Sequence, residues 1–180
     1  RKGVRWSATR AFLRPVEHRT NLDIQLNAHT LAVRFDRSAG RPRATGVALR
    51  LSDGTPREIA ATREVVLAAG AIGSPQILQL SGVGSPERLS CHGVPVVHAL
   101  PGVGENLQDH LQIRIQYKVS NVTTLNERAN SLFGKALMGA EYFLFRTGPL
   151  TMPPSQLGAF ARSDPAQPSA NIEWHVQPLL

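Results

Sequence analysis

The sequence predicts an α/β protein, α+β overall, in which a β-meander is inserted into a parallel sheet of the kind that holds cofactors. Three observations lead to this prediction. Short alternating segments separated by turns occupy residues 21–62 and are typical of antiparallel strands. The apolar run 65–67 indicates a strand buried on both faces. Residues 68–84 then pass from a small-residue turn into a helix, the geometry that places a ligand at a strand's carboxyl end. An ordinary β-α connection without a ligand fits the same spacing, so both interpretations stay open.

The first third of the chain is predicted to form one helix and a set of antiparallel strands. Ser7 can cap a short helix that Pro15 ends. Turn residues at 38–40 and 52–55 separate the expected strands. Alternation of apolar and polar residues places these strands at 21–26, 29–36, 44–51 and 57–62.

Two helices are expected after the apolar run, each opened by a Ser-Pro pair. Ser74 precedes a helix that Gly82 can end, because serine caps free N–H groups and glycine tolerates the terminal turn. Ser85 opens a second helix that ends at Gly93. A glycine-rich polar loop follows at residues 101–110.

A change in composition near residues 109–112 predicts a domain boundary. We expect one domain over residues 1–110 and the beginning of a second over 111–180. The second part is predicted to contain a strand, a polar loop, a helix and two further strands. These elements are expected at 111–119, 121–130, 131–145, 156–162 and 171–178.

Charge and composition exclude several classes of function. The net charge of +7 comes from residues 1–50, which hold eleven Lys or Arg against three Asp or Glu. These cations are scattered and lack interleaved aromatics, so we expect a solvated basic face and no nucleic-acid partner. No apolar run is long enough for a transmembrane segment. The single cysteine, Cys91, excludes an internal disulfide and fits a reducing compartment, so we expect a cytoplasmic location.

Several motifs together carry a family resemblance. The run GAIGSPQILQLSGVG at residues 70–84 resembles, position for position, the second signature of the glucose–methanol–choline (GMC) flavoprotein oxidoreductases. Other segments fall in the family order: residues 3–13, 21–22, 46–47, 63–66 and 102–110. The resemblance covers essentially the whole chain and is closest to the choline dehydrogenase-like branch, with counterparts at 148–151 and 172–178.

The resemblance implies a partial FAD-binding, Rossmann-like domain with an inserted β-meander, followed by the start of a mixed-sheet substrate domain. It implies FAD as cofactor and a small-molecule alcohol as substrate, with hydride passing from the carbinol carbon to the flavin. The electron acceptor is oxygen or a respiratory or dye-type acceptor. Two alternatives stay open: an FAD-containing lyase of the same fold, and a non-catalytic structural fragment.

The resemblance also assigns cofactor contacts residue by residue. Thr30 lies where the family contacts the adenine through its backbone, and the turn Ala68, Ala69, Gly70 passes beside the dinucleotide. Ser74 caps its helix, contacts the cofactor, or does both. Asn106 belongs to a loop that joins the two domains near the flavin, where it either ties the loop down or contacts the cofactor.

The sequence contains few candidate residues for the substrate side and no match for the catalytic base. His110 and His175 are the two histidines expected near a substrate pocket. The family's G-x-G-x-x-G element and its catalytic histidine have no match here, so we expect a central fragment with the catalytic base outside the chain. No histidine pair has metal-ligand spacing on a helix, and we expect no metal. Trp174 alternates with His175 and is expected in the core.

Overall fold

The computed structural model describes residues 2–153 and 155–178 of the chain. It mixes helices and strands, which confirms the predicted α/β class. Two compact units are present, one formed by Asp23–Ile113 and the other by Arg1–Leu22 with Arg114–Leu180. Each unit is described by itself. The expected domain boundary near residue 110 stays a prediction.

The unit Asp23–Ile113 begins with an antiparallel meander in the order β1-β2-β3. These strands are β1 (Ala28–Asp36), β2 (Arg43–Leu51) and β3 (Pro56–Ala60). The β2–β3 turn follows from its residues: Gly54 adopts φ +85°, and the Asp53 carboxylate accepts a hydrogen bond of 2.9 Å from the Thr55 N–H. The meander is therefore confirmed, but the strand predicted at 21–26 is wrong, since these residues form no ladder.

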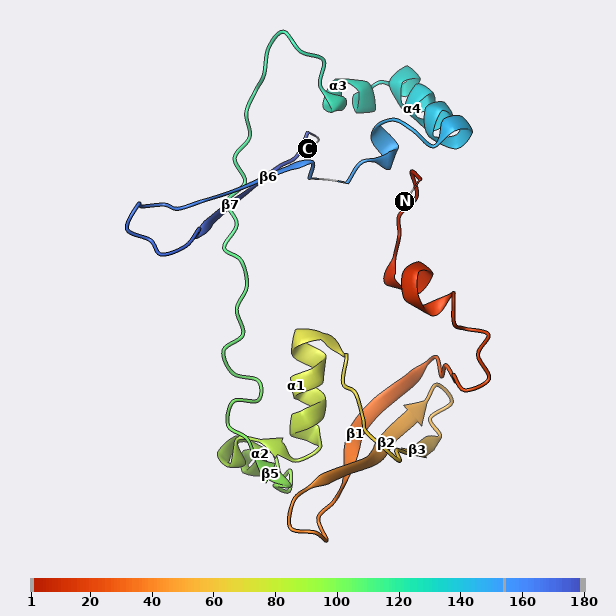
Figure 1. Ribbon diagram of the computed structural model, residues 1–180, viewed down its shortest axis with the longest axis vertical. Helices are drawn as coiled ribbons and strands as arrows, with labels where there is room; N and C mark the ends of the chain where they lie inside the picture. The colour runs from red at the N-terminus through yellow and green to blue at the C-terminus, as the bar shows by residue number, and fades with distance from the viewer. Residues whose placement is uncertain (1, 154, 179–180) are drawn as a thin grey trace. The chain divides into compact units, whose positions relative to one another are not determined.

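A layer of short elements packs beside the meander. Helix α1 (Gly70–Leu80) contacts β1, as Figure 1 shows, and leads into β4 (Val83–Gly84). Helix α2 (Pro86–Cys91) and strand β5 (His98–Ala99) follow, and β5 pairs with β4 in parallel. The buried apolar side chains come from both layers and from the following loop: Val33, Ala48, Leu49, Val83, Leu89 and Val103. This small core fixes α1 against the sheet.

The apolar run 65–67 does not form the predicted buried strand. Residues 65–67 belong to no ladder, and Val66 is 78% exposed. The reason is physical: a strand of a parallel sheet needs hydrogen-bonded neighbours, and no other described segment pairs with these residues. The apolar pattern alone therefore predicted a strand that residues 65–67 do not form.

The helix ends are partly as predicted. Ser85 caps α2, its hydroxyl accepting from the Arg88 N–H at 3.5 Å, and Gly82 follows α1 with φ +83°. Helix α1 begins at Gly70 rather than at Ser74, so Pro75 lies inside it. The prediction of a helix start at Ser74 is therefore wrong by a full turn.

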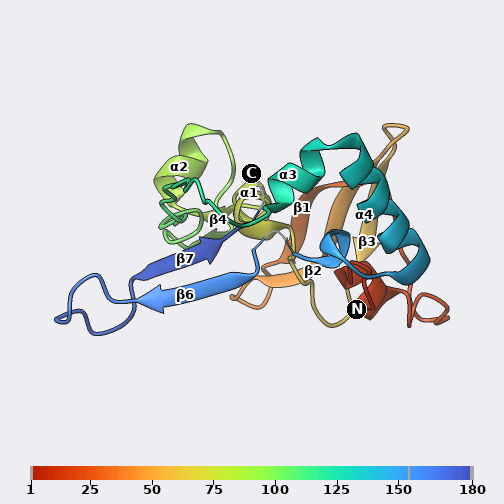
Figure 2. The same ribbon diagram turned by 90° about the horizontal axis from the view of Figure 1, so that it is seen from above.

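The second unit contains helices and one hairpin. A π-helix spans Thr9–Leu13, and the Ser7 hydroxyl accepts a hydrogen bond of 3.4 Å from the Arg10 N–H, close to the predicted cap. The remaining elements are α3 (Leu125–Asn130), α4 (Leu132–Phe145), a 3₁₀ turn (Pro149–Thr151), β6 (Leu157–Ala161) and β7 (Ile172–Val176). Figure 2 shows β6 and β7 side by side as an antiparallel hairpin.

Three predictions for this unit need correction. Residues 114–119 are extended but form no ladder, and neither do residues 111–113 of the first unit, where Leu111 is 94% exposed. The polar stretch expected as a loop contains α3, whose start is capped by Thr124. Trp174 is half exposed and does not lie in a core. Among the described residues, no helix combines the length and the hydropathy needed to cross a bilayer.

Candidate functional site

The turn that leads into α1 leaves its backbone open. Ala68, Ala69 and Gly70 are all exposed, and a Cβ built on Gly70 would meet nothing within 4 Å. Gly70 adopts φ +83°, a conformation that side chains disfavour. No described side chain caps the start of α1, so the first N–H groups of the helix carry its positive partial charge toward this turn. An extended or anionic ligand can approach the backbone closely here.

Ser74 stabilises this turn from inside the helix. Its hydroxyl accepts a hydrogen bond of 2.9 Å from the Ala69 N–H, across five residues. Ser74 therefore caps no helix start, but it satisfies the N–H group just before the helix begins. The structure thus brings Ser74 and Ala69 together, a contact that the sequence did not predict. A contact between Ser74 and a cofactor stays a prediction.

Thr30 lies at an irregularity of the meander. It is half-buried on β1 and pairs with Leu49 of β2. The ladder shifts between Thr30 and Ala32, so that Leu31 is the extra residue of a β-bulge. Bulges re-aim neighbouring backbone groups and often lie beside binding sites. The bulge is thus compatible with the backbone contact expected of Thr30.

The C-terminal end of α1 is tied to the meander by a buried hydrogen bond. The Ser81 hydroxyl accepts from the Val33 N–H at 2.8 Å and donates to the Ile77 carbonyl at 2.5 Å. Ser81 and Val33 are both buried. This bond gives a buried N–H of β1 its partner, which fixes the position of α1 relative to the strand that carries Thr30.

A second set of contacts ties the loop after residue 100 to the two helices. The Gln79 side-chain amide donates to the Val103 carbonyl at 3.0 Å, and the Arg88 guanidinium lies 2.5 Å from the Glu105 carboxylate. Asn106 follows in the left-handed region with φ +56° and is exposed, and its side-chain oxygen Oδ1 accepts a hydrogen bond of 3.2 Å from the Gln108 side-chain amide. Sequence reasoning missed these tethering residues, because contacts between helix and loop leave no local pattern.

The two histidines expected on the substrate side belong to different units. His110 is exposed in an extended segment, where its backbone N–H donates to the Asp109 carboxylate at 2.8 Å. His175 lies on β7 between two polar groups: its Nε2 is 2.9 Å from Glu173 Oε1, and its Nδ1 is 3.4 Å from Ser155 Oγ. Their placement near one substrate stays a prediction.

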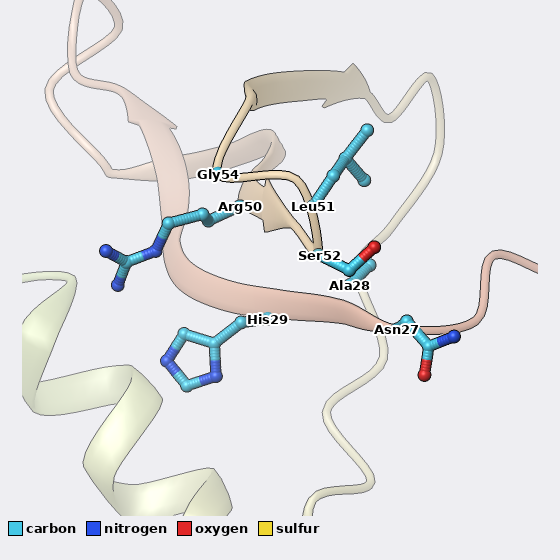
Figure 3. Close-up of a pocket in the computed structure, with 7 residues that line it drawn as sticks. All are labelled: Asn27, Ala28, His29, Arg50, Leu51, Ser52 and Gly54. Carbon is cyan, nitrogen blue, oxygen red and sulfur yellow. The ribbon is translucent and has the colours of Figure 1, made fainter.

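An open hollow of about 460 Å³ lies at the end of the β1–β2 ladder (Figure 3). It is lined by Asn27, Ala28, His29, Arg50, Leu51, Ser52 and Gly54. His29 and Arg50 face each other in the strand register, and no described acidic side chain lines the hollow. His29 directly precedes Thr30 in the sequence, but Thr30 is not one of the residues that line the hollow.

Two exposed aspartates in turns have lowered pKa values. The N–H of Ser38 donates to Asp36 and holds the pKa of that carboxyl below its usual value. The N–H of Thr55 does the same for Asp53. Both hydrogen bonds favour the charged form, which is the carboxylate. In the part of the chain that the structure describes, no cluster of three potential metal ligands occurs.

Comparison with known proteins places these features in a family. A family model described as GMC oxidoreductase matches residues 1–112. An oxygen-dependent choline dehydrogenase from Chromohalobacter salexigens is 42% identical over 178 residues, which are 99% of this chain and 31% of that protein. The chain therefore spans about a third of the length of this curated relative.

Comparison with solved structures agrees with the family match. A fungal aryl-alcohol oxidase matches with a TM-score of 0.74 and 28% identity, over 88% of this chain and 27% of the other. An FAD-dependent oxidoreductase from Chaetomium thermophilum matches with a TM-score of 0.67 and 32% identity, over 77% of this chain and 24% of the other. With the family model covering more than half of its residues, this chain belongs to the GMC oxidoreductase family.

Proposed function

We propose that the protein containing this chain is an FAD-dependent oxidoreductase that acts on the CH–OH group of a small alcohol and is choline dehydrogenase-like. The observation that carries the proposal is the 42% identity to an oxygen-dependent choline dehydrogenase along 99% of the chain. A match that extends over the meander, α1, the following loop and the β6–β7 hairpin supports a common reaction class, since it is not confined to one motif.

The turn before α1 fits the proposed cofactor. Ala68, Ala69 and Gly70 carry almost no side-chain bulk, and the uncapped start of α1 favours a negatively charged group. When bound, the flavin supplies the acceptor for the hydride that leaves the carbinol carbon. Within this chain, the role of the turn is to admit the dinucleotide close to the backbone, and the role of Ser74 is to hold the turn in place.

Thr30 and Asn106 complete the cofactor side of the proposal. The bulge at Leu31 turns the backbone of β1 beside Thr30, which suits an adenine contact through the main chain. Asn106 offers an exposed amide at a left-handed position, where Asn is tolerated better than most residues. Both residues bind and orient; neither transfers a proton.

On the substrate side we assign His110 and His175 as residues that face the alcohol. His175 is better supported, because Glu173 and Ser155 hold both of its ring nitrogens and so fix the ring orientation. We assign no catalytic base within this chain. The reaction removes two electrons and two protons from the alcohol and yields an aldehyde or ketone. The cytoplasmic location expected from the single cysteine stays a prediction.

The test uses the whole protein, purified with its cofactor and kept free of oxygen. Addition of choline should bleach the flavin absorbance, whereas tetramethylammonium, which has the cation but no hydroxyl, should leave it unchanged. Readmitted oxygen should restore the absorbance if the protein is an oxidase, and an artificial dye should be needed if it is a dehydrogenase. A protein that contains FAD but is bleached by no alcohol, including aryl and short aliphatic alcohols, would favour the lyase.

A further inference from the structure

We propose that Gln79 and Arg88 are positioning residues that clamp the backbone of residues 103–105 and thereby set the position of Asn106 at the cofactor. The inference deepens the proposed function and rests on it, because Asn106 is assigned there to the FAD site. Its structural basis is independent of that assignment and consists of contacts among α1, α2 and the loop.

The first half of the clamp is a closely fitted contact with α1. Gln79 donates its side-chain amide to the carbonyl of Val103 at 3.0 Å, in a partly buried setting. Val103 itself is buried. Gly104 follows with φ +81°, and a Cβ at this residue would lie 2.7 Å from the Gln79 amide nitrogen. A side chain at residue 104 would force the Gln79 amide to move away from Val103, and glycine also tolerates the backbone conformation of this residue.

The second half is an ion pair with α2. Arg88 Nη2 lies 2.5 Å from Glu105 Oε1, with both side chains about half exposed. An exposed pair of this kind contributes little by itself because water screens it. Its effect here comes from location: the hydrogen bond and the ion pair act on residues 103 and 105, two positions apart, from two different helices. Together they restrict the loop to one path.

The contacts of Gln79 and Arg88 with residues 103–105 set the position of Asn106. In the described chain, the one hydrogen bond of its side chain comes from Gln108, two residues further along the same loop. No described contact ties Asn106 itself to a helix or strand. A change in the path of residues 103–105 therefore moves Asn106, and the free energy of cofactor binding changes with it.

The first experiment compares two glutamines of α1 in the whole protein. Gln79→Leu removes the donor to Val103 at nearly constant volume. Gln76→Leu is the matched control, because Gln76 is exposed on the same helix and its side chain makes no described hydrogen bond. Loss of one hydrogen bond should raise the Kd for FAD about 3- to 10-fold for Gln79→Leu and leave it within about 2-fold for Gln76→Leu. The Kd is measured by flavin fluorescence on dilution, at a temperature where both variants are folded.

The second experiment exchanges the charges of the ion pair. Arg88→Glu alone should raise the Kd for FAD about 2- to 5-fold, and the double exchange Arg88→Glu with Glu105→Arg should restore most of it. The Arg34–Glu58 ion pair on the meander is the control. Its Nη2 and Oε1 atoms are also 2.5 Å apart, and its side chains are comparably exposed. Arg34→Glu should leave the Kd unchanged.

The outcomes distinguish a clamp that positions Asn106 from contacts that only stabilise the fold. They also distinguish failure of this inference from failure of the proposed function. If Gln79→Leu lowers the unfolding temperature but leaves the Kd and the flavin absorbance spectrum of the holoprotein unchanged, the clamp is structural only and the inference is wrong. The same holds if the double charge exchange fails to restore the Kd. A wild-type protein that binds no FAD would instead overturn the proposed function.

Discussion

The hydroxyl of Ser81 accepts a hydrogen bond of 2.8 Å from the backbone N–H of Val33, joining the end of α1 to β1 across 48 residues of sequence. Both residues are buried, with 8% and 5% of their surface exposed. Ser81 thus supplies an acceptor for this buried N–H of β1. This bond holds the helix that begins at the proposed cofactor turn.

Removing the Ser81 hydroxyl should destabilise the protein. Ser81→Ala leaves the Val33 N–H buried without an acceptor, which costs about 1–3 kcal/mol of unfolding free energy. Ser90→Ala is the control, since Ser90 is exposed on α2 and its hydroxyl makes no described hydrogen bond; its effect should stay within about 0.5 kcal/mol. Urea unfolding of the whole protein measures both. Equal effects would show that the bond does not stabilise the fold.

Two glycines with positive φ should respond differently to alanine. Gly82 and Gly93 have φ of +83° and +66°, so each substitution carries a conformational cost of about 1–2 kcal/mol. A Cβ at Gly82 would also collide with the Pro95 carbonyl oxygen and lie 2.8 Å from Val97 Cγ2, whereas the space around Gly93 is open. Gly82→Ala should therefore cost about 1–3 kcal/mol more than Gly93→Ala.

Denaturant unfolding of the two variants checks this difference. Equal losses would mean that β4 and the segment before β5 move apart easily, and that Gly82 is required for its φ alone. A large loss only for Gly82→Ala would establish close approach of the two backbones as the reason for glycine at this position.

The features that local chemistry determines were predictable from the sequence. Alternation placed β1 and β2 within a residue of their observed bounds, and Ser85 with Gly93 marked the ends of α2. The buried strand at 65–67 was wrong, because an apolar run needs neighbouring strands to become a strand. Strand pairing depends on segments that are distant in the sequence, and a local pattern contains no information about them.

The candidate site was predictable only in part, for a similar reason. The small residues Ala68–Gly70 stand out in sequence, but Ser74-Pro75 suggested a helix start one turn too late, because Gly70 and Gly73 are poor helix formers and hid the first turn. Gln79 and Val103 are separated by 24 residues, and Ser81 and Val33 by 48. Contacts of this kind come from tertiary packing, which spacing does not encode.

Acid should remove the stabilisation that the turn aspartates provide. Hydrogen bonds from backbone N–H groups lower the pKa of Asp36 and Asp53 in the folded protein, so the unfolded chain binds protons more readily. Their contribution is fully present above the unfolded pKa and is lost as the pH falls through the folded pKa. Asp53→Asn keeps an acceptor for the Thr55 N–H but removes the titration, and should reduce the loss of stability below about pH 4.

Thermal unfolding of the whole protein between about pH 3 and 6 tests this prediction. Asp23→Asn serves as the control, because the Asp23 carboxylate accepts no hydrogen bond in the described chain. If Asp53→Asn and Asp23→Asn change the pH dependence to the same extent, the turn hydrogen bond does not contribute to acid sensitivity.

The open backbone at Gly70 gives the sharpest test of the proposed cofactor turn. Gly70 and Gly54 have nearly equal φ values of +83° and +85°, and a Cβ at either would meet nothing within 4 Å of this chain. Alanine should therefore cost both positions the same backbone strain, about 1–2 kcal/mol. Gly54 lies in the β2–β3 turn and is assigned no cofactor contact, whereas Gly70 begins α1 and is proposed to face the dinucleotide.

Gly70→Ala should accordingly weaken FAD binding at least 10-fold in the whole protein, because the added methyl group would occupy the space into which the cofactor is proposed to pack. Gly54→Ala should lower stability to the same degree while its FAD content stays at the wild-type ratio. Flavin absorbance relative to protein, measured after gel filtration, gives both values. Equal FAD content in the two variants would remove Gly70 from the cofactor site, since strain alone would then account for every effect of the substitution.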